Sequence, residues 1–85
     1  EEVSSKLVYA NELSKSNKQQ AIEQYKNVLS QDPKNIVALN NVAWLLFELG
    51  NLDEAKTYAD VALTYYPNNT AVADTHRQIV SALAQ

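Results

Sequence analysis

Residues 35–67 decide the fold, and they read NIVALNNVAWLLFELGNLDEAKTYADVALTYYP. The first half of this stretch carries apolar residues at the i, i+3, i+4, i+7 spacing of one helix face, namely Leu39, Val42, Ala43 and Leu46. Gly50 then ends the helix, as glycine commonly does. A second helical stripe, made of small residues, follows at Ala55, Ala59 and Ala62. The stretch therefore predicts two helices joined by a tight turn.

The two prolines indicate that this unit is repeated. Pro33 and Pro67 are 34 residues apart, and the same shift aligns further pairs: Ala21 with Ala55, Val28 with Ala62 and Leu29 with Leu63. A fixed period of this length is typical of stacked helix pairs, because one pair cannot bury its apolar face alone. We expect five helices, at residues 3–15, 18–31, 35–49, 52–65 and 69–84. Asparagines stand at four of the predicted starts, where their side chains can cap a helix: Asn17, Asn35, Asn51 and Asn69.

The first helix admits two registers. Strict 34-residue spacing places Ser5, Val8, Tyr9 and Glu12 in the core positions. One extra residue in the turn between Ser14 and Lys18 brings in Lys6, Tyr9, Ala10 and Leu13 instead. We favour the second register, because it buries a leucine rather than a glutamate.

With these residues the chain resembles the tetratricopeptide repeat family, whose pattern has a large residue, then Leu and a small residue, and later Ala, an aromatic residue, Ala and Pro. The matching positions here are Leu39, Val42, Ala43, Leu46, Ala55, Ala59, Ala62 and Pro67. Ala59 departs from the pattern, which usually has an aromatic residue there. The resemblance implies an all-α fold, an α-α superhelix of antiparallel helix pairs. We predict a single domain over 1–85, with a first repeat at 1–34, a second at 35–68 and a capping helix at 69–85.

The last predicted helix differs from the repeats. A shift of one period places Arg77 in a slot that needs a small residue, so we expect no further repeat to follow. We expect Val72, Ile79, Val80 and Leu83 to pack on the second repeat, with His76, Arg77 and Gln78 toward water. We also expect Tyr66 to be exposed, and Tyr58 and Tyr65 to pack between helices.

The predicted helix at 35–49 is apolar nearly all round, so its second face also needs a cover. The resemblance implies that this face lines a concave groove that binds peptides. The corresponding positions are Val37, Asn40, Asn41, Trp44, Phe47 and Glu48, with Asn11 on the first helix. Trp44 and Phe47 would act as anchors, and Asn40 and Asn41 would hydrogen-bond a partner's backbone. The alternative is that this chain's own first and last helices cover both aromatic rings.

Composition excludes several classes of function. The chain has a net charge of -3 and no basic stripe, so we expect no nucleic-acid partner. Its longest apolar run, at residues 42–47, is too short to cross a bilayer. The chain has no cysteine, one histidine and one glycine, which argues against a metal site, a cofactor or a phosphate-binding loop. The compartment stays undetermined, because a chain without cysteine suits reducing and oxidising settings alike.

The sequence therefore predicts a non-enzymatic module that binds a peptide or helix of a partner protein. Because the excess acids fall after residue 43, we expect an acidic second half of the groove, suited to an amphipathic or mildly basic segment. The alternative is a structural segment that self-associates through the same apolar face, as a homodimer or within a longer array. The residues from Asn40 to Leu46 also resemble long bacterial tetratricopeptide proteins, including exported ones.

Overall fold

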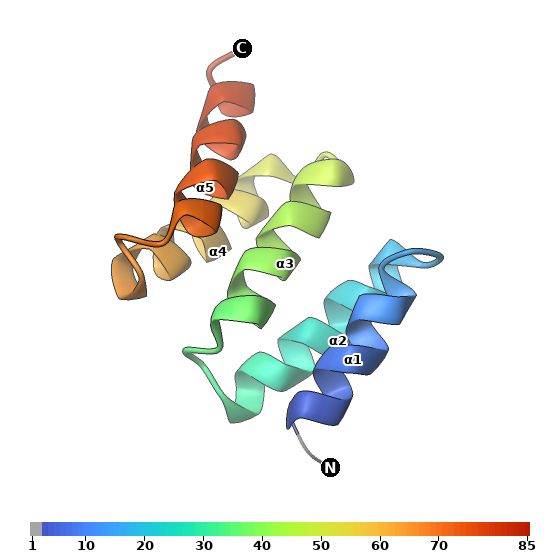
Figure 1. The fold of residues 1–85 in the computed structure, drawn as a ribbon. Helices are drawn as coiled ribbons and strands as arrows, with labels where there is room; N and C mark the ends of the chain where they lie inside the picture. Colours follow the sequence, from blue (N-terminus) through green and yellow to red (C-terminus); the bar gives the residue numbers. More distant parts are fainter. Residues whose placement is uncertain (1–2) are drawn as a thin grey trace.

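The computed structural model describes residues 3–85, which form five α-helices (Figure 1). The helices are α1 (Val3–Leu13), α2 (Lys18–Gln31), α3 (Ile36–Glu48), α4 (Leu52–Tyr65) and α5 (Thr70–Leu83). The predicted all-α fold with five helices is confirmed, and each helix end lies within two residues of its predicted place. The division into repeats at 1–34, 35–68 and 69–85 stays a prediction, and residues 1–2 of its first repeat lie outside the described residues.

Asparagine side chains cap the N-termini of three of the helices. Asn17, Asn35 and Asn69 each accept a hydrogen bond from the backbone N–H three residues later, at 3.0–3.1 Å. The prediction was wrong for Asn51, whose side chain makes no capping bond. The backbone N–H of Asn51 instead donates to Leu46 O at 2.9 Å, and that of Gly50 donates to Phe47 O. Asn51 therefore helps to close the end of α3, in a turn where Gly50 has a φ of +85°.

The helices pack in sequence, and α3 lies at the centre. α1 packs on α2, α2 on α3, α3 on α4 and α4 on α5, and α3 also touches α5. In Figure 1, α3 lies between the pair formed by α1 and α2 and the last helix, α5, with α4 behind it. The result is a staggered stack of antiparallel helix pairs, in which α1, α3 and α5 lie toward the same side.

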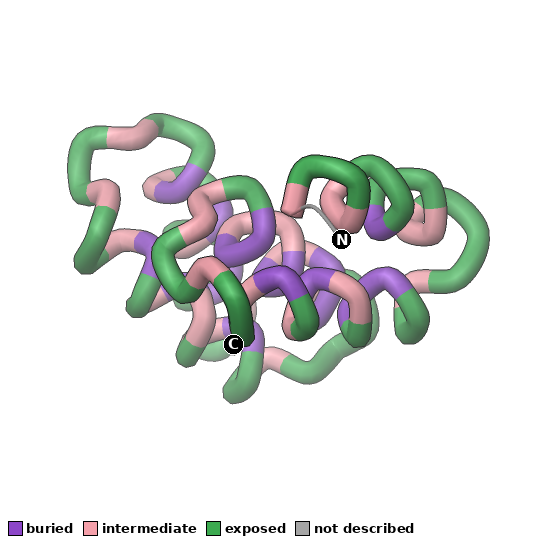
Figure 2. The backbone as a smooth tube through the Cα atoms, turned by 90° about the horizontal axis from the view of Figure 1, so that it is seen from below, coloured by how far each residue is buried: buried purple, intermediate pink, exposed green. Residues whose placement is uncertain are grey.

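Small residues let the helices approach closely at the core. Ala21, Ala43, Ala55 and Ala59 are at most 2% exposed, and larger side chains fill the space around them, including Ile22, Tyr25, Val28 and Leu46. Figure 2 shows buried segments where helices face one another and exposed segments along the outer turns.

The register of α1 agrees with the favoured alternative. Ala10 is fully buried and Leu13 packs against the core, whereas Ser5 and Glu12 are exposed. Tyr9 is nevertheless 54% exposed, which corrects its predicted core position. Its counterpart in α3, Val42, is surrounded because α3 has helices on several sides, whereas α1 packs mainly on α2.

Two further predictions about side chains were wrong. On α5, Val80 and Leu83 are 38% and 37% exposed, and the buried residues are Val72, Thr75 and Ile79. α5 thus buries only the face that packs on the preceding helix pair. Within residues 3–85 no helix follows α5 to cover its other face. Near the end of α4, Tyr66 is half-buried and its hydroxyl donates to Lys34 O. Tyr65 is the exposed ring, and Lys34 Nζ lies 5.0 Å from its centre.

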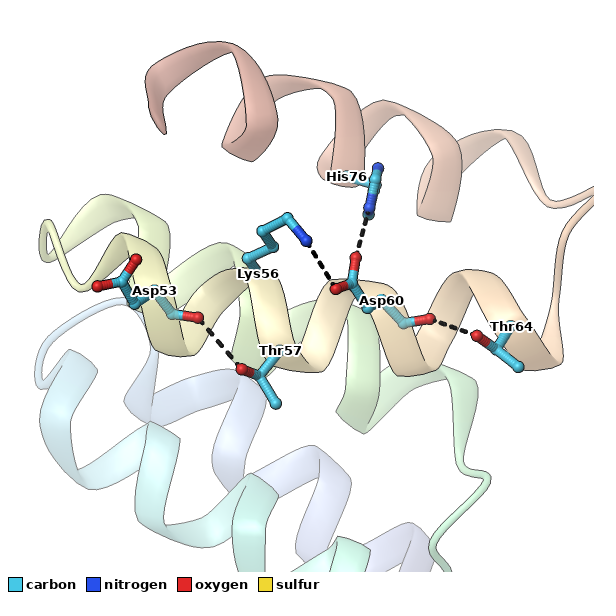
Figure 3. Close-up of polar contacts among 6 residues, drawn as sticks. All are labelled: Asp53, Lys56, Thr57, Asp60, Thr64 and His76. Atoms are coloured by element: carbon cyan, nitrogen blue, oxygen red, sulfur yellow. Dashed lines mark hydrogen bonds and ion pairs between the residues drawn. The ribbon is translucent and has the colours of Figure 1, made fainter. Parts of the chain in front are cut away.

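Polar contacts link α4 to α5, as Figure 3 shows. His76 Nε2 lies 2.7 Å from Asp60 Oδ1, and Lys56 Nζ lies 2.9 Å from Asp60 Oδ2. His76 is half-buried by this contact, which corrects its expected position toward water. Lys56 and then His76 hold the pKa of the Asp60 carboxyl below its usual value.

Candidate functional site

Three hollows lie along the exposed side of α3. The polar hollow, of about 210 Å³, lies where α1, α2 and α3 meet and is lined by Asn11, Ser14, Tyr25, Asn41, Trp44 and Leu45. The apolar hollow, also of about 210 Å³, lies between α3 and the start of α5 and is lined by Ile36, Val37, Asn40, Asn41, Asn69, Ala71 and Val72. The arginine hollow, of about 400 Å³, lies between Phe47 and the second half of α5 and is lined there by Arg77, Gln78, Ser81, Ala82 and Gln85. We call the three together the α3 groove.

The structure brings six of the seven predicted site residues to the α3 groove. Asn11 and Trp44 line the polar hollow, Val37 and Asn40 line the apolar hollow, and Asn41 lines both. Phe47 lines the arginine hollow. Glu48 is exposed and lines none of the three. That these residues bind a partner stays a prediction.

Trp44 lines the polar hollow and its neighbour Phe47 lines the arginine hollow. They lie one turn apart on α3, with ring centroids 5.0 Å apart and ring planes inclined by 38°. Both side chains are half-buried, and Phe47 packs partly against the core. The chain's own helices therefore cover each ring in part and leave aromatic surface open to the groove.

Asn41 joins the groove to the core. Its Nδ2 donates to the hydroxyl of Tyr25 at 3.0 Å, and the Tyr25 residue is only 1% exposed. Burial raises the pKa of the Tyr25 phenol, and the bond from Asn41 offsets part of that rise. The phenol therefore stays neutral at physiological pH, and Asn41 keeps donor and acceptor positions for a ligand.

Sequence reasoning missed the contribution of α2 and α5 to the groove. Tyr25 of α2 is buried in the core and also lines the polar hollow, where its hydroxyl meets Asn41. A 34-residue shift of the groove positions Val37, Trp44 and Phe47 leads to Ala71, Gln78 and Ser81, and all three line hollows. The repeat period could therefore have predicted which residues of α5 line the groove.

The electrostatics of the groove differ from the acidic second half that we expected. Among the described residues that line the three hollows, Arg77 is the only charged one. The acids Asp53, Glu54 and Asp60 lie on α4 and line none of the three hollows. Asp74 forms an ion pair with Arg77 along α5. The lining of the three hollows is therefore neutral apart from one cation, because most of the acids that follow residue 43 lie on α4.

Within residues 3–85, no three His, Asp or Glu side chains come together in a way that could hold a metal ion. His76 is engaged with Asp60 and lines none of the hollows. None of the described helices is both long enough and apolar enough to cross a membrane.

Most of the chain matches one known protein family. A family model described as Tetratricopeptide repeat matches residues 13–79, a segment that contains α2, α3 and α4 and most of α5. No curated protein matches the chain significantly.

Proposed function

Because the chain belongs to the tetratricopeptide repeat family, whose repeats generally mediate protein–protein interaction, we propose that it binds a peptide or helix of a partner protein in the α3 groove. The observation that carries the proposal is the pair Trp44 and Phe47, two neighbouring half-buried rings that line the polar hollow and the arginine hollow respectively. Binding energy at protein interfaces concentrates on a few aromatic anchors of this kind.

The groove offers a partner both apolar area and backbone hydrogen bonds. A fully buried tryptophan covers on the order of 150–250 Å², and each Å² of apolar surface removed from water contributes about 25 cal/mol. The side-chain amides of Asn11 and Asn40 have no hydrogen-bond partner within residues 3–85. Such amides can pair with the N–H and C=O groups of a bound segment.

The test begins with a random 12-residue peptide library displayed on phage and selected against the chain. We expect the selected peptides to bind wild type and to lose binding to Trp44→Ala. Tyr9→Ala is the matched control, since it removes an aromatic ring that is 54% exposed and lines none of the hollows. Far-UV circular dichroism and thermal melting establish that both variants fold. Selected peptides that bind Trp44→Ala as well as wild type would overturn the proposal.

Self-association through the same groove is tested separately. Trp44 is the only tryptophan, so its emission and its quenching by acrylamide report on this face alone. The proposal expects quenchable emission that stays constant across a protein dilution series and becomes protected when a selected peptide is added. Emission that shifts to the red on dilution would instead indicate that a second copy covers the groove.

A further inference from the structure

We propose that the arginine hollow recognises an acidic side chain, so that the segment bound in the α3 groove is mostly uncharged and carries Asp or Glu where it meets Arg77. This inference rests on the proposed function and names the chemistry of the partner. It also differs from the expectation drawn from the distribution of charge along the sequence, which was a mildly basic partner.

The first argument is the charge of the lining. Arg77 is the only charged residue among the described residues that line the three hollows, and its neighbours in the arginine hollow are Phe47, Gln78, Ser81, Ala82 and Gln85. A lysine or arginine of a partner would meet no carboxylate in these linings, whereas an acid would meet a guanidinium. Charge complementarity at the groove therefore favours an acid.

The second argument is the hydrogen-bonding capacity of Arg77. The guanidinium carries five N–H donors, and its ion pair with Asp74 engages Nη2. The two side chains are 68% and 58% exposed, and an ion pair this accessible to water contributes little stability. A ligand carboxylate can therefore share or displace this pair, and a bidentate contact with Arg77 becomes possible.

Two acids on this side of the molecule oppose the proposal, and they sharpen its test. Asp74 competes for the same guanidinium, and Glu48 follows Phe47 at the end of α3. Glu48 lines none of the hollows, so its repulsion acts through solvent and is screened by salt, whereas a contact with Arg77 is direct. Removal of Asp74 should consequently strengthen the preference for an acid.

The experiment repeats the phage selection on wild type, Arg77→Gln, Asp74→Asn and Lys15→Gln. Lys15→Gln is the matched control, because Lys15 also forms an exposed i,i+3 ion pair and lines none of the hollows. We expect Asp and Glu to be enriched about threefold or more near one end of the peptides selected on wild type. The enrichment should vanish on Arg77→Gln, persist on Lys15→Gln and increase on Asp74→Asn.

A selected peptide then gives the quantitative test. Replacing its enriched Glu by Gln should weaken binding to wild type on the order of tenfold, and should leave binding to Arg77→Gln unchanged. Peptides that need Trp44 but show equal acid content on wild type and Arg77→Gln, or enrichment of Lys and Arg, would overturn this inference and leave the proposed function standing. If no selected peptide needs Trp44, the proposed function fails and the inference fails with it.

Discussion

Asn41 and Tyr25 form the contact that fixes one wall of the groove. The phenol is buried in the core, and the amide of Asn41 reaches it from α3 at 3.0 Å. This bond positions Asn41 between the polar and apolar hollows, both of which it lines. A residue of the core thus orients a residue of the candidate site.

Tyr25→Phe should therefore lower the free energy of unfolding by about 1 kcal/mol, the typical net contribution of one hydrogen bond. Tyr9→Phe should change it by less, because Tyr9 is 54% exposed and its hydroxyl has no hydrogen-bond partner among residues 3–85. Urea unfolding at neutral pH, followed by circular dichroism, measures both. An equal loss in the two variants would show that the contact with Asn41 does not contribute.

The lowered pKa of Asp60 leads to a prediction about how the stability of the folded chain depends on pH. Since its pKa is lower in the folded chain than in the unfolded chain, its contribution is present above the unfolded pKa and is lost as pH falls through the folded value. Asp60→Asn should be less stable than wild type at pH 7, and the two should converge at pH values below the folded pKa of Asp60. The difference is small, because the Asp60 side chain is 46% exposed. Thermal melting as a function of pH tests this, and a difference that is independent of pH would contradict the assignment.

At the scale of the helix, the asparagines at the helix N-termini differ in whether their side chains cap the helix. Asn69 caps α5 through its side chain, whereas Asn51 makes no side-chain cap and uses its backbone to close α3. Asn51 lies 34 residues after Asn17, whose side chain does cap its helix, so the repeat pattern alone could not separate the two kinds. The difference comes from the turn at Gly50, which is shared by two helices.

Asn69→Ala should cost about 1 kcal/mol of stability, within the range measured for lost caps. Asn51→Ala should cost clearly less, because only a side chain without a capping bond is removed. Equilibrium unfolding in urea compares the two variants directly. The reverse order would mean that the turn after Gly50 depends on the Asn51 side chain.

At the scale of the whole molecule, the sequence predicted what depends on local pattern. Helix number and helix ends follow from the repeat period, because a helix stripe and most of its caps are set by neighbouring residues, whereas the groove positions were expected from the resemblance to the family. Exposure of Tyr9, Val80 and Leu83 could not be predicted in this way, since it depends on which helices lie beside α1 and α5. The neutral lining of the groove was also missed, because the acids of the second half lie mainly on α4 rather than in the linings.

The central claim is that the α3 groove is the binding surface, and a matched pair of valine substitutions tests it most directly. Val37 is 45% exposed and lines the apolar hollow, whereas Val8 is 66% exposed on α1 and lines none of the hollows. Val37→Asp and Val8→Asp change charge and size equally, and neither site is in the core. The measurement is the dissociation constant of one fluorescently labelled selected peptide for each variant, obtained by anisotropy. The account predicts at least roughly tenfold weaker binding to Val37→Asp, about 1.4 kcal/mol, and binding to Val8→Asp within about twofold of wild type. Equal affinities for the two variants would contradict it.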